Sequence, residues 1–367
     1  MKNYKNISLT ILFFAFVLLP FLGCENTSDE QIYMTFDKVD YVIDFPNTFK
    51  LSESKTPQVD IVGLSDFTIF DSLLILGTKK SDGLWDLYSL PDYQPLGSFL
   101  KRGDGPEEFM QGPGASMKNK IVKESGQIIA YIYDFEKGSI KRFNISESIK
   151  SKELHLSTME KILPPFLFDF VMLDSAEIFI REIGDFDTHQ IRFIVNENNK
   201  KIEMPFLEKL NETAISKGKN INILSTIIKS SPLGNRLVEM PVFLNYINLY
   251  SPNGEFYKTI CVGDKLFDIS VVQEQEEWSW ASHFSNVSVF DGFFGVVYHE
   301  EKRKKSPSIL LFDLEGSPLA ELELENHITS FDIDFNSMEL YTFDSENDKF
   351  LKYNIQNVLS EIGLSKL

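Results

Sequence analysis

The sequence lacks the short motifs that many enzymes use. It has no Gly-x-Ser-x-Gly elbow and no Gly-x-x-x-x-Gly-Lys-Ser/Thr phosphate loop. Its five histidines, at positions 155, 189, 283, 299 and 327, do not have the spacing of metal ligands. The stretch from His299 begins like a zinc-protease helix but has Arg303 where the second histidine should stand. The sequence therefore predicts no catalytic residue, no metal and no cofactor.

Basic residues are also scarce. Lysine and arginine total 36 against 54 aspartate and glutamate, which gives a net charge of −18. If residues 1–23 are removed, Lys2 and Lys5 are lost and no acid, so the charge becomes 34 − 54 = −20. A surface this acidic repels nucleic acid and anionic lipid. We therefore expect no nucleic-acid partner, and contact with a membrane only through an anchor.

What the chain has in abundance is apolar and aromatic side chains. Of its 367 residues, 43% are hydrophobic and 13% aromatic, including 32 phenylalanines. Residues that favour β-strands are common and strong helical patterns are few. One large all-β domain with a sizeable core accounts for this composition.

The N-terminus has the pattern of an export signal. Lys2 and Lys5 precede a short apolar run that contains Pro20 and ends at Gly23-Cys24. A basic start, a short apolar core and a small residue before the cleavage point indicate a signal peptide, here residues 1–23. The run is too short for a comfortable transmembrane helix.

The position of Cys24 resembles the lipobox of bacterial lipoproteins. The resemblance implies that Cys24 becomes a lipidated N-terminus and that the protein is an outer-membrane lipoprotein, on the periplasmic face or at the cell surface. The alternative is an ordinary cleaved signal with an incidental cysteine. Residues 24–31 are acidic and polar, which predicts a tether before a domain at residues 32–367. The remaining cysteine, Cys261, lies in an apolar run and is expected to be buried and inert.

A short pattern built around an aromatic residue recurs about every 50 residues, which is typical of a propeller of four-stranded blades. The six aromatic residues are Tyr88, Phe143, Phe193, Tyr250, Phe312 and Tyr353. Five tight turns, at 70–72, 124–126, 173–175, 290–292 and 335–337, precede five of them. The region 331–355 reads as three short strands. The predicted fold is an all-β, six-bladed β-propeller.

Three further stretches need a place in this fold. The last blade is one strand short, so we expect the alternating stretch 39–45 to pair there and close the ring. Residues 201–231 contain apolar side chains at roughly helical spacing, and residues 267–284 form a polar segment. We interpret both as insertions that decorate one rim of the propeller.

The stretch KRGDGPEEF at 101–109 resembles the Gly-x-Gly-Pro-Gly-Glu-Phe loop of bacterial six-bladed propeller lipoproteins, which are related to TolB-like and NHL-repeat propellers. The matching residues are Gly103, Gly105, Pro106, Glu108 and Phe109, and Glu107 replaces the third glycine. With the repeats, the resemblance covers almost the whole chain. It implies fold and location but no reaction. We expect the loop to turn sharply between the first two blades, with Phe109 in the core. The alternative is an anion-binding loop, but no helix N-terminus clearly follows it in the sequence.

The candidate ligand-binding residues are two tryptophans, a histidine and two arginines: Trp278, Trp280, His283, Arg102 and Arg181. Aromatic side chains in a polar insertion can stack on a sugar or a peptide, and an arginine can bind a carboxylate. The alternative for the tryptophans is a structural role as a cap over the core. Asp332 and Asp334 lie two apart on a predicted strand and can both face the central channel.

The sequence leads to one expected function and one alternative. The expected function is a non-catalytic binding or scaffolding module for a peptide, a glycan or an envelope protein. The alternative is a metal-dependent propeller hydrolase similar to lactonases, which requires at least three oxygen ligands on the inner strands.

Overall fold

The computed structural model describes residues 32–161, 163–164, 167–174, 177–184, 187–299 and 306–364. The predicted signal peptide, Cys24 and the predicted tether lie outside these residues, so their roles stay predictions. Residues 32–367 form one compact unit. No helix among the described residues combines the length and apolarity needed to cross a bilayer.

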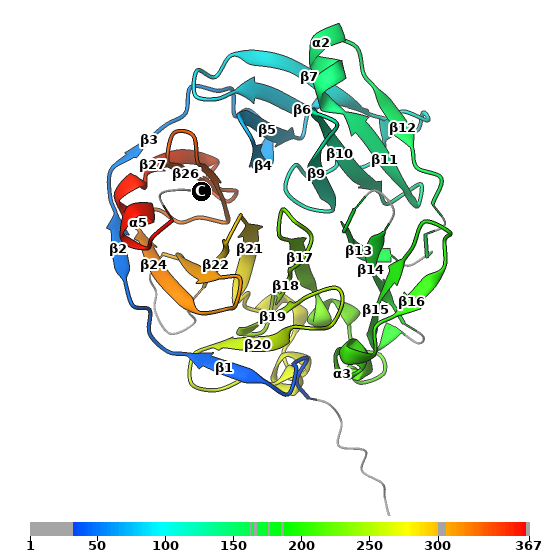
Figure 1. Ribbon diagram of the computed structural model, residues 1–367, viewed down its shortest axis with the longest axis vertical. Coiled ribbons are helices and arrows are strands. Elements are labelled where there is room, and N and C mark those ends of the chain that lie inside the picture. The colour runs from blue at the N-terminus through cyan, green and yellow to red at the C-terminus, as the bar shows by residue number, and fades with distance from the viewer. Residues whose placement is uncertain are drawn as a thin grey trace, which may run out of the picture. The chain divides into compact units, whose positions relative to one another are not determined.

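Six sheets are arranged in a ring, as the repeats predict (Figure 1). We number these sheets as blades in chain order. Blade 1 contains β4 (Leu64–Phe70), β5 (Leu73–Thr78), β6 (Asp82–Ser89), β7 (Pro95–Arg102) and β8 (Glu108–Phe109). Blade 2 contains β9 (Asn119–Glu124), β10 (Gln127–Asp134), β11 (Ser139–Asn144) and β12 (Leu156–Thr158). Blade 3 contains β13 (Leu167–Met172), β14 (Ile178–Ile183), β15 (Gln190–Val195) and β16 (Lys201–Glu203).

The second half of the ring repeats the same antiparallel order. Blade 4 contains β17 (Thr226–Ser230), β18 (Leu237–Pro241), β19 (Tyr246–Tyr250) and β20 (Tyr257–Val262). Blade 5 contains β21 (Phe284–Val289), β22 (Phe293–Tyr298), β23 (Ser308–Asp313) and β24 (Pro318–Leu324). Blade 6 contains β25 (Ser330–Asp334), β26 (Glu339–Asp344) and β27 (Lys349–Asn354). All six recurrent aromatic residues lie on the third strand of their blade, and the five predicted turns join first and second strands.

Six hydrophobic clusters hold the ring together, one at each interface between neighbouring blades. The alternation of side chains along each strand explains this, because successive residues face opposite sides of a sheet. On β10, Ala130 and Ile132 pack toward blade 1, whereas Ile129, Tyr131 and Tyr133 pack toward blade 3. Each blade is therefore apolar on both faces.

The chain before blade 1 runs along the outer edge of three blades (Figure 1). β1 (Val39–Val42) pairs in parallel with β20 in blade 4, and β2 (Thr48–Leu51) pairs in parallel with β24 in blade 5. β3 (Ser54–Lys55) pairs with β27 and supplies the fourth strand of the last blade. An N-terminal strand thus closes the ring, but the prediction that 39–45 does so is wrong. The alternation of side chains does not show which of the three N-terminal strands joins the last blade, because the outer edges of blades 4, 5 and 6 all accept a strand.

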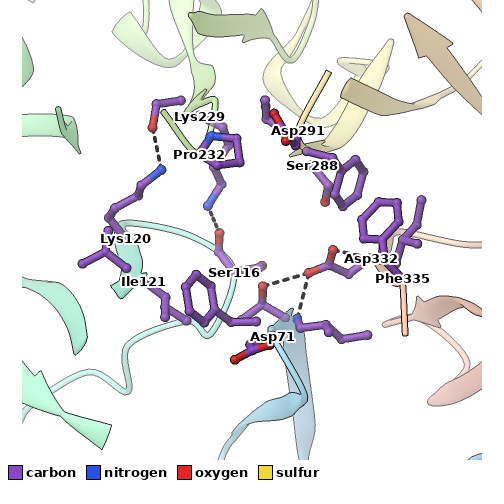
Figure 2. Close-up of a pocket in the computed structure, with 18 of the residues that line it drawn as sticks. Asp71, Ser116, Lys120, Ile121, Lys229, Pro232, Ser288, Asp291, Asp332 and Phe335 are labelled. Atoms are coloured by element: carbon purple, nitrogen blue, oxygen red, sulfur yellow. Dashed lines mark hydrogen bonds between the residues drawn. The ribbon is translucent and has the colours of Figure 1, made fainter. Parts of the chain in front are cut away.

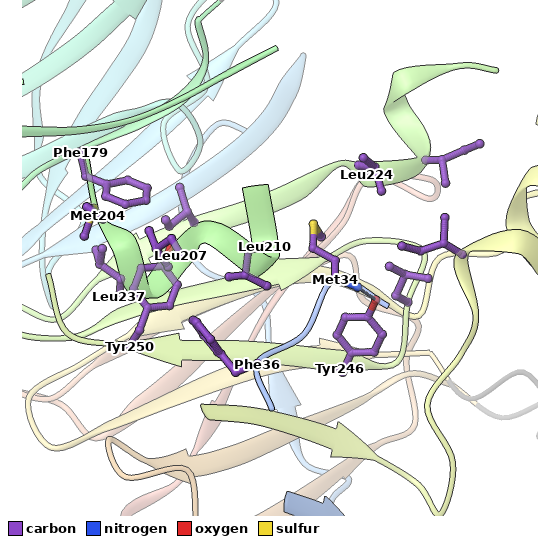
Figure 3. Close-up of a cluster of buried hydrophobic side chains, with 14 of the residues drawn as sticks. Met34, Phe36, Phe179, Met204, Leu207, Leu210, Leu224, Leu237, Tyr246 and Tyr250 are labelled. Carbon is purple, nitrogen blue, oxygen red and sulfur yellow. Dashed lines mark hydrogen bonds between the residues drawn. The ribbon is translucent and has the colours of Figure 1, made fainter. Parts of the chain in front are cut away.

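The residues just before β1 are anchored in the core (Figure 3). Met34 and Phe36 lie in the cluster between blades 3 and 4 and are 1% and 2% exposed. The N–H of Met34 donates to the Tyr246 hydroxyl at 3.0 Å, and the N–H of Phe36 donates to Thr259 Oγ1 at 2.9 Å. These bonds fix the start of the outer segment.

Short helices fill the remaining connections. They are α2 (Ile145–Ser151), η2 (Pro205–Leu207), α3 (Glu208–Glu212), η3 (Ile221–Leu224), α4 (Ile269–Glu274), η4 (Glu277–Ser279) and α5 (Gln356–Glu361). The segment 267–284 contains two short helices, α4 and η4, before β21 begins at Phe284. The interpretation of 201–231 as one insertion is wrong at both ends, because β16 and β17 belong to blades 3 and 4.

Candidate functional site

A pocket of about 630 Å³ lies at the centre of the ring. The first strands of five blades line it: β4, β9, β17, β21 and β25. Its rim includes exposed residues of the hairpins that join first and second strands, such as Asp71, Asp291 and Asn336. A second cavity of about 250 Å³ shares Lys120 and Ser230 with it. The pocket thus opens at one end of the channel.

Two lysines from different blades reach into this pocket on one side (Figure 2). Lys120 on β9 donates from Nζ to Ser230 Oγ at 2.6 Å. Lys229 on β17 donates from Nζ to the backbone carbonyl of Ser116. Among the residues that the structure describes, neither ammonium has a carboxylate oxygen within 4.0 Å. Each therefore makes its hydrogen bond to an uncharged oxygen.

Enclosure by the protein changes how these lysines titrate. Burial, together with the positive charge of Lys229, lowers the pKa of Lys120 to about 8. Burial also lowers the pKa of Lys229, although Asp169, Asp332 and Asp66 act in the opposite direction. Removing an ammonium from water without a close counter-ion is unfavourable. Lys120 and Lys229 are both in this unfavourable environment, within one pocket.

The loop that carries Ser116 is fixed by Asp66 on β4. The Asp66 carboxylate accepts the N–H groups of Ala115 and Ser116, both at 2.9 Å, and the Ser116 hydroxyl at 3.0 Å. A Cβ on Gly77 would lie 2.1 Å from Asp66 Oδ1, so this arrangement requires glycine there. The carbonyl that binds Lys229 is thus held in place by blade 1.

The opposite side of the pocket is aromatic. Phe290 follows β21, Phe331 lies on β25 and Phe335 follows β25. The ring of Phe290 lies 5.2 Å from that of Phe335 and 6.5 Å from that of Phe331, measured between centroids. Such edge and tilted contacts fix the rings against one another. The pocket therefore has a cationic side and a rigid apolar side.

Asp332 lies on the apolar side, between the last and the first blade (Figure 2). Its Oδ2 atom accepts the Thr68 hydroxyl at 2.9 Å and the Ile69 N–H at 2.8 Å. Burial raises the pKa of Asp332 to about 6, although these hydrogen bonds act against the shift. Asp334 does not line the pocket. It accepts the Ser337 hydroxyl and the Asn336 N–H of the hairpin.

Arg181 lies in a buried ion network between blades 3 and 4. Its guanidinium is fully buried, 3.7 Å from Asp169 and 3.7 Å from Glu239, and it donates to Thr226. Arg192 donates to both carboxylate oxygens of Glu239 at 2.6 to 3.0 Å. Burial alone would raise the pKa of Glu239, but the two arginines hold it at about 2. Arg181 thus binds carboxylates of the protein itself.

The other predicted ligand-binding residues do not lie together. Trp278 is 87% exposed, whereas Trp280 packs edge-on against Phe243 with centroids 5.2 Å apart. His283 is 5% exposed and contacts the ring of Phe267. Arg102 is exposed at the end of β7. None of the five lines the central pocket. Their part in binding stays a prediction.

The loop at 101–109 is a structural turn. Glu108 Oε2 accepts the N–H of Gly105 at 2.9 Å, and the N–H of Gly103 donates to the Phe109 carbonyl at 3.1 Å. A Cβ on Gly103 would lie 2.1 Å from Glu108 Oε2. Lys137 donates to the carbonyls of Gly105 and Glu108, and Phe109 is 1% exposed in the cluster between blades 1 and 2. The expectation that Phe109 enters the core is confirmed.

Within the described residues, one group of three acidic or histidine side chains has its ligand atoms within 4.8 Å of one another: His327, Asp344 and Glu346. It lies at the hairpin between second and third strands of blade 6, outside the pocket. Asp344 already accepts the N–H groups of Glu346 and Asn347. The described inner strands bring no such group together.

Lys120 and Lys229 were missed by reasoning from the sequence. Lys229 follows Thr226-Ile227-Ile228 in an apolar run that was interpreted as helical. The signal that could have been used is the β-branched run Thr226-Ile227-Ile228 directly before Lys229, because such a run favours a strand over a helix. Cys261 is buried on β20 as expected, and burial raises the pKa of its thiol to about 11. A thiol with a raised pKa is less ionised near neutral pH and so a poorer nucleophile.

Residues 65–336 match the model of a family described as "TolB-like 6-blade propeller-like". This match covers more than half of the chain. No curated protein sequence matches this chain.

Solved structures with a similar backbone arrangement have low sequence identity to this chain. The β-propeller domain of Cps50 (Swd1) from Myceliophteria thermophila is 10% identical with a TM-score of 0.41, over 79% of this chain and 83% of that one. Hydrazine synthase from Kuenenia stuttgartiensis is 11% identical with a TM-score of 0.44, over 84% of this chain and 80% of that one. Both TM-scores are below 0.5, and nothing about this chain is concluded from them.

Proposed function

The chain belongs to the TolB-like six-blade propeller family, and from that premise we propose that it is a non-catalytic binding module whose ligand enters the central pocket. The observation that carries the proposal is the pocket itself, with two lysines that lack a close carboxylate among the described residues. A volume of about 630 Å³ is in the range of small-molecule sites. Mixed polar and aromatic walls are typical of such sites.

The pocket limits what can enter it. A folded partner cannot enter a cavity of this size, but a small molecule, a peptide end or a terminal sugar can. A partner protein in the cell envelope would have to insert such a group or contact the rim. The hydrolase alternative has no support from the acids and histidines on the described inner strands, and we do not propose it.

We also propose that the binding module is lipid-anchored outside the cytoplasm through Cys24. The support is the sequence alone: the basic start, the short apolar run and Gly23 before Cys24. Labelled palmitate should be incorporated by cells that make the natural chain and not by cells that make Cys24→Ser. Equal labelling of both chains would contradict the anchor and leave the pocket unaffected.

Photo-crosslinking tests the location of the binding site. p-Benzoylphenylalanine is placed at Asn336, which lines the pocket and is exposed at its rim, and at Glu346 as a control. Glu346 is exposed on the same blade but at the hairpin of the opposite end. Irradiation of intact cells should give adducts at position 336 and few at position 346. Equal adducts at both positions, or none at 336, would contradict a ligand site in the pocket.

A further inference from the structure

The two sides of the central pocket differ in chemistry, and this difference restricts the ligand. Lys120 and Lys229 come from blades 2 and 4, whereas Phe290 and Phe335 come from blades 5 and 6. Figure 2 shows the two lysines on one side, with Asp332 and Phe335 across the pocket. A ligand that contacts both sides must have a polar end and an apolar end.

We expect the polar end to be an anion, because three of the acids in or beside the pocket, Asp66, Asp71 and Asp332, already have partners, and Asp291 is exposed at the rim. Asp71 lies 3.2 Å from Lys123, Asp66 accepts three bonds from the 115–116 segment, and Asp332 accepts Thr68 and Ile69. The two lysines instead donate to Ser230 Oγ and to the Ser116 carbonyl. An ammonium has three N–H donors, so each retains donors for a ligand.

The acidic residues that line the pocket also limit the charge of the anion. Asp291 and Asp332 also line the pocket, and they would repel a group with two negative charges. Among the described residues, the lining includes no arginine that would bind a phosphate through two parallel bonds. With Asp291 and Asp332 in the same lining, a single carboxylate matches the charge of the pocket better than a phosphate does.

We propose that the central pocket binds a carboxylate attached to an apolar body, with Lys120 and Lys229 contacting the carboxylate and Phe290 and Phe335 contacting the body. This inference rests on the proposed binding function and names the ligand class for the same pocket. A free organic acid and the C-terminus of a peptide with an apolar last residue share this chemistry. Partly buried lysines that line a pocket and have a shifted pKa are candidates for functional residues.

The test compares an acid with its neutral counterpart. Binding of 4-phenylbutyrate and of 4-phenylbutyramide is measured by calorimetry on the chain from residue 24 onward, with the dipeptide Ala-Phe and its C-terminal amide as the peptide arm. We expect the acid to bind at least about tenfold more tightly than the amide, because the neutral amide cannot make charge-assisted hydrogen bonds with the two lysines. Tighter binding of Ala-Phe than of 4-phenylbutyrate would identify the peptide as the source of the carboxylate.

Variants assign the effect to the pocket. Lys229→Met should weaken the acid at least about tenfold and leave the amide unchanged, so the amide reports that the pocket is intact. Phe335→Ala should weaken both. Lys150→Met, at an exposed helical position, should change neither. If Lys229→Met does not fold, Lys120→Met is measured in its place.

The outcomes separate this inference from the proposed function. Equal affinity for acid and amide, or an unchanged acid affinity in both lysine variants, would overturn the carboxylate assignment. Crosslinked adducts at position 336 would then still support a binding module with a neutral ligand. An absence of adducts at 336 would contradict the binding site as a whole.

Discussion

The Oδ2 atom of Asp332, on the first strand of blade 6, accepts a hydrogen bond of 2.8 Å from the N–H of Ile69, on the first strand of blade 1. These two residues are 263 positions apart in the sequence. The bond joins the ends of the ring at its centre, whereas β3 joins them at its outer edge. The carboxylate that closes the ring is thus also part of the pocket wall.

Ionisation of Asp332 should lower stability. Burial raises its pKa to about 6, above the ordinary range of an aspartate, so its favourable contribution is complete below about pH 4 and is lost as the pH rises through 6. The unfolding free energy of the natural chain minus that of Asp332→Asn should therefore fall between about pH 4 and pH 7, by about 3 kcal/mol at most. Urea unfolding followed by fluorescence measures this difference. A difference that stays constant or rises with pH would contradict the prediction.

The Glu239 carboxylate should be among the most sensitive positions for stability. Glu239→Gln leaves Arg181 and Arg192 buried without their shared counter-charge and should cost about 3–5 kcal/mol. The control is Glu147→Gln, which breaks an exposed pair with Lys150 and should cost at most about 1 kcal/mol. Because the pKa of Glu239 is lowered to about 2, the difference from the Gln variant should persist at neutral pH and shrink only as the pH falls from about 4 through 2. Equal costs for the two variants would be inconsistent with this network.

The adjacent residues Phe109 and Met110 should differ sharply. Phe109 is 1% exposed and Met110 is 49% exposed. Phe109→Ala removes a ring from the cluster between blades 1 and 2 and should cost about 3–5 kcal/mol. Met110→Ala should stay within about 0.5 kcal/mol. Urea midpoints of the two variants decide this, and a small effect at Phe109 would show that the loop does not contribute to the core.

Affinity for a carboxylate should depend on pH through groups on several strands. The pKa of Lys120 is about 8, so 4-phenylbutyrate should bind more weakly as the pH rises through 8 and this ammonium loses its proton. Lys229 and Ser230 face Lys120 from β17, the Lys123–Asp71 pair lies at the rim, and Asp291 and Asp332 line the other side. Below about pH 6 protonation of Asp332 should strengthen binding further, since its negative charge is removed.

Calorimetric titrations at several pH values test this profile, with Lys120→Met as the comparison. The variant should lose the fall in affinity near pH 8 and retain the change near pH 6. Parallel profiles of the natural chain and the variant above pH 7 would show that Lys120 does not bind the anion. Lys150→Met serves as a control with an exposed lysine and should follow the natural chain.

The recurrent aromatics and hairpin turns were sufficient to predict six blades, because a repeated four-stranded sheet must bury both faces against its neighbours. The glycine-rich loop at 101–109 led separately to the expectation that Phe109 lies in the core, where it is 1% exposed. Residues 39–45 show the limit of this reasoning. Their alternation identifies a strand, but the edge that it joins depends on how far the segment reaches around the ring.

The sequence by itself determined the fold class and the number of blades, because these follow from side-chain alternation and turn chemistry over short distances. Only the tertiary structure decided which polar residues share a site. Lys120 and Ser230 are 110 positions apart, and Thr68 and Asp332 are 264 apart. Closure of the ring brings their strands to one axis, and no spacing along the chain records that proximity.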